Sequence, residues 1–107
     1  MHKHWTYADL THTPDDGKRY EIFDGELVVT PAPGPPHQLT VFELTMRLYL
    51  ELKKFAIAYS SPIDVLLRWD RVLMPDIVVV RHARRSIVTE RAIEGAPDLV
   101  AQLLSRC

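Results

Sequence analysis

The strongest pattern in the chain is a helical repeat of apolar residues between His37 and Phe55. Apolar side chains recur every three to four residues there, at Leu39, Phe42, Met46, Tyr49 and Leu52, with Leu44, Leu48 and Phe55 widening the stripe. Polar residues fall on the other side, at Thr40, Glu43, Arg47, Glu51 and Lys54. The pattern predicts an amphipathic helix over 37–55 that buries its apolar stripe, Phe42 and Met46 included, in the core.

Two continuous apolar runs predict buried β-strands. The first covers residues 77–80, the second residues 99–104, and each directly follows a Pro-Asp pair, Pro75-Asp76 and Pro97-Asp98. An unbroken apolar run is typical of a central strand covered on both faces. We therefore expect an α/β (α+β) domain in which the long helix packs on a sheet containing both runs.

Local signals predict the remaining elements. Two short apolar runs around Asp24-Gly25 predict a β-hairpin with a type I′ turn. The proline-rich segment 31–36 predicts an ordered loop. The other expected elements are short helical turns capped by Thr6 or Thr11, a turn at 14–17, strands at 56–59 and 63–67, a turn at 69–71, a basic loop at 81–85 and a helical turn within 86–94.

Length and composition place the chain among ordinary globular proteins. Its 107 residues have room for one domain, 1–107, and 47% of them are apolar and 25% charged. No apolar run approaches the roughly 18 residues that suggest a membrane-spanning helix, and the first residues lack the apolar core of a signal peptide. The single cysteine, Cys107, excludes a disulfide framework or a cysteine-based zinc site and fits a reducing cytoplasm.

The charge pattern bears on nucleic-acid binding. A net charge of −1 argues against a strongly basic, non-specific nucleic-acid binder but leaves room for a local basic surface. The best candidate follows the first apolar run, at Arg81, His82, Arg84 and Arg85. This group either meets a nucleic-acid backbone or forms a solvated loop.

Three polar residues lie where a site would need them. Asp76 stands at the entrance of a buried strand, where a carboxylate either binds a cation or caps the turn after Pro75. Gln102 interrupts an apolar strand, so it either needs a polar partner or faces solvent at a sheet edge. Glu21 lies on the first hairpin strand and faces either solvent or a site.

Several short motifs in order resemble a known family. They are Tyr20–Leu27, Pro31–Pro33, His37-Gln38, Pro75–Ile77 and Gly95–Val100. Together they resemble the putative restriction endonuclease family, abundant in cyanobacteria, of the PD-(D/E)xK nuclease superfamily. The resemblance runs from about Thr6 to Ser105. It implies a restriction-endonuclease-like fold, with helices flanking a mixed sheet, and Mg²⁺- or Mn²⁺-dependent hydrolysis of DNA.

The resemblance also assigns residues to roles. Asp76 matches the first metal-binding carboxylate, and Glu21 matches an early glutamate that joins the acidic cluster. His37 matches a histidine at the helix start, where backbone N–H groups can meet a phosphate. Gln102 occupies the position at which the family has a glutamate. We therefore expect Asp76, Glu21 and Gln102 to converge on one pocket and to share the metal.

Two departures from the family pattern shape the expected activity. A neutral amide at Gln102 weakens metal binding. The helix carrying the catalytic lysine, and the strand after it, would follow Ser105. These departures predict a truncated or degenerate nuclease with weak or no cleavage. The alternative is a non-catalytic module that keeps the fold and binds nucleic acid or protein. An uncovered sheet edge would also offer a homodimer contact.

Overall fold

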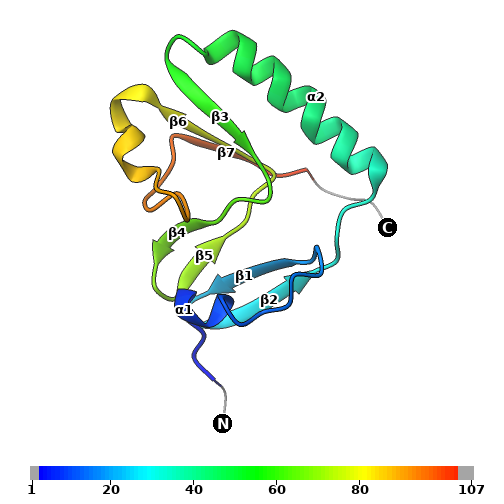
Figure 1. Cartoon of the computed structure of the whole chain (residues 1–107), viewed down its shortest axis with the longest axis vertical. Helices are drawn as coiled ribbons and strands as arrows, with labels where there is room; N and C mark the ends of the chain where they lie inside the picture. The colour runs from blue at the N-terminus through cyan, green and yellow to red at the C-terminus, as the bar shows by residue number, and fades with distance from the viewer. Residues whose placement is uncertain (1–2, 104–107) are drawn as a thin grey trace.

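The computed structural model describes residues 3–103, which form two antiparallel sheets, one long helix and two short helical segments (Figure 1). In chain order the elements are α1 (Tyr7–Leu10), β1 (Arg19–Phe23), β2 (Glu26–Thr30), α2 (Pro35–Leu52), β3 (Ala56–Ser60), β4 (Val65–Arg68), β5 (Arg71–Leu73), β6 (Ile77–Arg81), the 3₁₀ helix η1 (His82–Ile87) and β7 (Leu99–Ala101). This arrangement confirms the expected α+β class.

The first sheet has the strand order β2-β1-β5-β4 and grows from the predicted hairpin. Asp24 and Gly25 both have positive φ angles, 51° and 87°, as a type I′ turn requires. The sequence pattern missed β5, a three-residue strand that pairs with β1 through Ile22 and Val72. Strand β5 is too short to show a hydrophobic alternation of its own, so it is recognised only by its pairing with β1 and β4.

The second sheet has the order β3-β6-β7 and contains both predicted apolar runs. Its central strand β6 is buried on both faces, with residues 77–80 no more than 4% exposed. Val78 and Val80 pack against Val65 of β4, in the first sheet, and against Ile93, which pairs with Val65 through a parallel bridge. The continuous run at 77–80 therefore marks the core strand, as predicted.

Helix α2 lies along β3 (Figure 1), but the side it buries differs from the predicted one. Leu39, Phe42, Met46 and Tyr49 are each about half exposed or more, so the predicted core stripe is wrong at these four positions. The residues in contact are the buried Val41 and the half-buried Leu44, Leu48 and Leu52. Both stripes have helical spacing, so spacing alone did not distinguish them.

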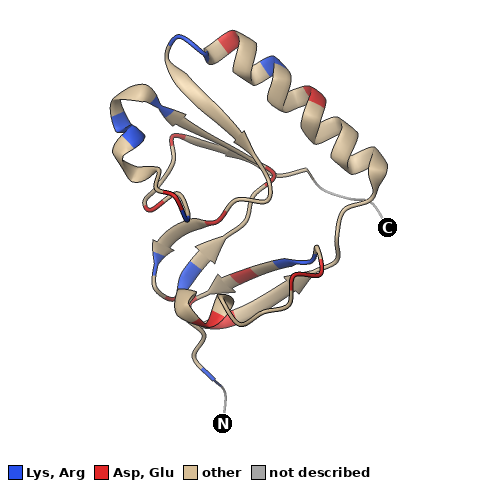
Figure 2. Cartoon of the chain, in the orientation of Figure 1, with Lys and Arg blue, Asp and Glu red and all other residues tan. Residues whose placement is uncertain are grey.

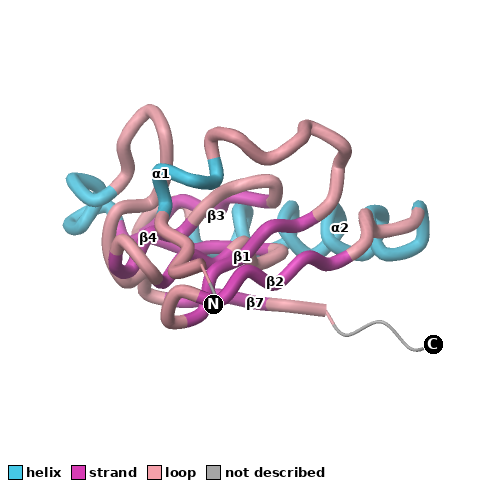
Figure 3. Tube along the Cα trace, turned by 90° about the horizontal axis from the view of Figure 1, so that it is seen from below, coloured by secondary structure: helices cyan, strands magenta, loops and turns pink. Residues whose placement is uncertain are grey.

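The shape of the molecule explains this exposure. It measures 48 × 35 × 20 Å along its principal axes, and the view from below shows α2 at the same level as the strands (Figure 3). Ala56 and Ala58 of β3 pair with Arg81 and Val79, on the face opposite Tyr59, which packs in the core. Small side chains there leave room for α2. The layer is thin, so nothing in the described residues covers the outer side of the helix.

Three element boundaries also differ from the predictions. Helix α2 begins at Pro35, because prolines at its first two positions lack only N–H groups that a helix start leaves unpaired. The turn predicted within 86–94 is replaced by η1 and a bridge between Val88 and Ile93. Strand β7 ends at Ala101, and Leu104 lies outside the described residues. Within residues 3–103, no helix has the length and apolar character to span a membrane.

Candidate functional site

The Asp76 carboxylate lies at the junction of the two sheets and is fully buried. Its Oδ1 accepts hydrogen bonds from Arg19 Nη2 at 2.6 Å and from His37 Nε2 at 3.0 Å. Its Oδ2 accepts one from the backbone N–H of Leu103 at 2.7 Å. Three donors from β1, the first turn of α2 and the segment after β7 therefore converge on one carboxylate.

The hydrogen bonds determine the protonation of Asp76. Burial alone would raise the pKa of this carboxyl, but the hydrogen bonds from His37, Leu103 and Arg19, with the charge of Arg19, outweigh burial and lower the pKa below its ordinary value. The group is therefore ionised at neutral pH. Since a carboxylate only accepts, His37 Nε2 must carry the proton in that contact.

Arg19 is the site residue that the sequence did not reveal. Its side chain is 9% exposed and pairs with Asp76, which is 57 residues further along the chain. A buried arginine almost always has an anionic partner, but nothing in the local pattern around Lys18-Arg19 identifies the partner. The one available signal is alternation, since Arg19 and Glu21 are two residues apart on β1 and share a face.

Glu21 is also buried, but it makes no hydrogen bond to Asp76. Its Oε2 accepts the backbone N–H of Met74 at 2.8 Å, two residues before Asp76. Glu21 therefore holds the chain that leads into β6. Alternation along β1 places it on the same side of the strand as Arg19.

Gln102 is near Asp76 in the backbone, but its side chain is exposed. Ile77 pairs with Ala101, so a ladder continued by one residue would place Gln102 opposite Asp76. Instead β7 ends, and the next residue, Leu103, donates its N–H to Asp76. Among the described residues the Gln102 side chain makes no hydrogen bond. Its predicted role as a metal ligand stays a prediction.

As the side chains lie, the oxygen atoms around Asp76 do not form a coordination site for a divalent cation. Carboxylate and amide oxygens are the right ligand type for Mg²⁺. Both oxygens of Asp76 and one of Glu21 are engaged by N–H donors, and Arg19 already supplies the positive charge. Within residues 3–103, no three His, Cys, Asp or Glu side chains gather where they could hold a metal.

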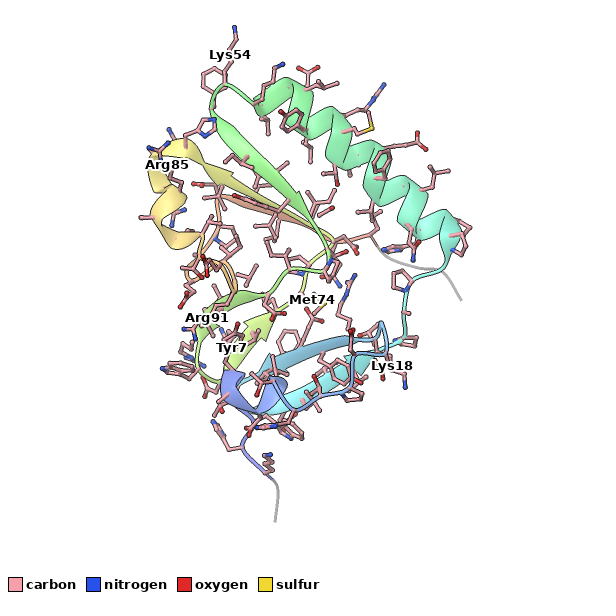
Figure 4. All side chains as sticks on the ribbon, in the orientation of Figure 1. Tyr7, Lys18, Lys54, Met74, Arg85 and Arg91 are labelled. Atoms are coloured by element: carbon pink, nitrogen blue, oxygen red, sulfur yellow. The ribbon has the colours of Figure 1, made fainter. Side chains whose placement is uncertain are left out.

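A cavity of about 610 Å³ lies beside the cluster. Arg19 and His37 line it, together with Lys18 and Met74, which Figure 4 labels. Asp76, Glu21 and Gln102 are not among its lining residues. Arg19 and His37 thus stand between the cavity and Asp76. Figure 2 shows no acidic or basic residue on the first two turns of α2, so the cationic groups here come mainly from the chain around Lys18.

The basic segment predicted at residues 81–85 forms the end of β6 and the start of η1. Arg84 bonds to Asp98 Oδ1 at 3.2 Å and to the carbonyl of Ala96 at 2.7 Å, and His82 contacts the carbonyl of Lys53. These contacts are intramolecular and order the surface. They leave two exposed cations in this segment, Arg81 and Arg85, whose side chains make no ion pair among the described residues.

Comparisons with known proteins bear on this site. A family model described as "Putative restriction endonuclease" (Uma2) matches residues 6–106. Among solved structures, the chain is similar to a "putative nuclease belonging to DUF820" from Anabaena variabilis ATCC 29413. The TM-score is 0.74 at 22% identity, over 94% of this chain and 58% of that chain. A comparison with curated proteins found no match.

These findings confirm the family resemblance drawn from the motifs. At 22% identity, the similarity to the cyanobacterial structure shows the fold. The chain spans a little over half the length of that nuclease.

Proposed function

The chain belongs to the Uma2 family, described as "Putative restriction endonuclease", and from this premise we propose that it acts on DNA as an endonuclease-type protein centred on Asp76. The proposed reaction is phosphodiester hydrolysis assisted by Mg²⁺ or Mn²⁺. The proposed activity is weak or absent in the side-chain arrangement described above.

One observation carries the proposal, namely a fully buried, ionised carboxylate at the entrance of the central strand. Burying a charge is costly unless it is paired, and a cluster of this kind is a candidate functional site. The carboxylate stands behind a cavity lined by Arg19 and His37. A guanidinium and an imidazole are suitable groups for contacting a phosphate.

The chain's own residues have distinct proposed roles. His37, in the first turn of α2, would exchange a proton at Nε2, since this atom already holds one against Asp76. Arg19 would orient a phosphate entering the cavity. A divalent ion would supply charge stabilisation when bound to oxygen ligands. Because Asp76, Glu21 and Gln102 do not form a ligand set as they lie, no step is assigned to that ion.

Two features support weak activity. Gln102 replaces a charged ligand with a neutral amide, which lowers affinity for hard cations. Arg19 already balances the charge of Asp76 at 2.6 Å. Changing Gln102→Glu should therefore strengthen Mn²⁺ binding in a metal titration while restoring little cleavage. Full cleavage by this variant would contradict the proposed role of the Arg19 pair.

A plasmid-nicking assay with Mg²⁺, Mn²⁺ or EDTA tests the proposal. We expect slow nicking at most, lost in Asp76→Asn and unchanged in Asp98→Asn. Asp98 is a matched control, because it also follows a proline and precedes a strand, but its carboxylate bonds to Arg81 and Arg84 of the basic segment instead of to Arg19 or His37. Metal-dependent nicking that persists in Asp76→Asn would refute the assignment of the site.

The alternative function is binding without cleavage, and the ion pair at Asp76 favours it. A gel-shift experiment separates the two, since DNA binding by wild type and Asp76→Asn alike, without nicking, would identify a binding module. A homodimer through β7 belongs to the same alternative. β7 is an edge strand whose Leu99 and Val100 are about half exposed. Light scattering of the purified chain would detect this dimer.

A further inference from the structure

The closest cation to Asp76 is part of the protein itself. Arg19 Nη2 lies 2.6 Å from Asp76 Oδ1, and the two side chains are 9% and 0% exposed. Water screens such a pair poorly, so the attraction is strong and the pair resists separation. The counter-charge of this carboxylate is therefore built into β1.

A divalent ion and this guanidinium would compete for the same atom. An ion bound at Oδ1 would need the lone pairs that Arg19 and His37 now occupy. It would also lie beside a like charge in a region of low dielectric, which is strongly unfavourable. An ion at Oδ2 would share that oxygen with the Leu103 N–H, which it accepts at 2.7 Å, and would still lie close to the Arg19 charge.

Arg19 has a place to move. Its side chain lines the cavity of about 610 Å³, which also contains two acidic residues, Asp15 and Asp16. These carboxylates could balance the guanidinium once it leaves Asp76. Glu21, on the same face of β1, would keep its hydrogen bond to the Met74 N–H, two residues before Asp76.

We propose that Arg19 is a built-in counter-ion that excludes divalent cations from the Asp76 cluster, so that a cation binds there only when the guanidinium moves into the neighbouring cavity. The proposal rests on the proposed function in treating Asp76 as the ligand of such a cation. It explains why Asp76, Glu21 and Gln102 do not form a metal site as they lie. It also predicts that a substitution at Arg19 will create a metal site.

The test is Mn²⁺ titration by calorimetry, with melting curves recorded with and without the ion. Arg19→Gln removes the competing charge and should bind Mn²⁺ at least about tenfold more tightly than wild type. The ion should raise the melting temperature of this variant more than that of wild type. Arg19→Lys keeps a charge but loses the guanidinium, so its affinity should lie between the two.

Lys18→Gln is the matched control. It removes the same charge one residue away, from an exposed side chain that lines the same cavity without contacting Asp76. Its Mn²⁺ affinity should equal that of wild type. The double variant Arg19→Gln with Asp76→Asn should lose the gained site, which places the ion at Asp76.

Several outcomes would overturn the proposal. The first is that wild type and both Arg19 variants bind Mn²⁺ with equal affinity. The second is that Lys18→Gln gains as much Mn²⁺ affinity as Arg19→Gln. The third is that neither Arg19 variant binds Mn²⁺. If Arg19→Gln does not fold without metal, its refolding on addition of Mn²⁺ supports the proposal. If it does not refold with Mn²⁺ either, the Mn²⁺ affinity of Arg19→Lys, compared with that of wild type, is the test.

The plasmid assay separates this inference from the proposed function. Equal Mn²⁺ affinity in all variants together with Asp76-dependent nicking would refute the inference and leave the nuclease proposal standing. A gained Mn²⁺ site in Arg19→Gln, with no nicking even when that variant is saturated with Mn²⁺, would support the inference and favour binding without cleavage over the nuclease proposal.

Discussion

Asp76 and Asp98 have the same local sequence setting and opposite tertiary surroundings. Each follows a proline and immediately precedes a strand of the same sheet. Asp76 is fully buried and pairs with Arg19, 57 residues away, whereas the partly exposed Asp98 contacts Arg81 and Arg84, 17 and 14 residues away. The proline-aspartate pair marks a strand start, and the distant partner determines whether the carboxylate becomes part of a site.

A third aspartate extends the comparison. Asp64 directly precedes β4 and is partly buried, but its carboxylate makes no hydrogen bond among the described residues. Burial raises its pKa, whereas hydrogen bonds lower the pKa of both Asp76 and Asp98. The pKa values of three carboxylates that each directly precede a strand therefore shift in different directions, because their tertiary neighbours differ.

The largest expected effect comes from breaking the buried pair. Asp76→Ala leaves the Arg19 guanidinium buried without a partner, which should lower the free energy of unfolding by about 3–5 kcal/mol. Asp98→Ala should cost far less, because solvent screens its contacts. Urea denaturation measures both, and similar losses in the two variants would mean that the Asp76 pair is not special.

Acid sensitivity should distinguish the same positions. The pKa of Asp76 is below its ordinary value of 3.8, so its contribution to stability is complete above that pH. The contribution is lost as pH falls through the lower folded-state pKa, because protonation then breaks the Arg19 pair. The acid-unfolding curve of Asp76→Asn should therefore be flatter below about pH 4 than that of wild type. Identical slopes for wild type and Asp76→Asn would contradict the lowered pKa.

The smallest effect has the opposite sign. Since burial raises the pKa of Asp64, this carboxylate is destabilising at neutral pH, above its ordinary value of 3.8. Asp64→Asn should raise the free energy of unfolding by less than about 1 kcal/mol, because the group is partly exposed and solvent screens it. Denaturation midpoints at pH 7 provide the measurement, and a loss of stability would indicate a partner for Asp64 in solution.

The sequence alone determined the features that depend on neighbouring residues. The type I′ hairpin follows from Asp24-Gly25, since both positions need positive φ. The long helix and the buried strand at 77–80 follow from hydrophobic periodicity and continuity. The position of Asp76 at a strand entrance follows from the same run. These elements were predictable because their energetics act over a few residues.

Tertiary structure alone decided which surfaces and charges meet. It chose Val41 and Leu44 over Phe42 and Met46 as the buried side of α2, because β3 offers its alanine face to that side. It also brought Arg19 to Asp76 and left Gln102 exposed where β7 ends. Contacts between distant residues depend on how two sheets join, and no local pattern records that geometry.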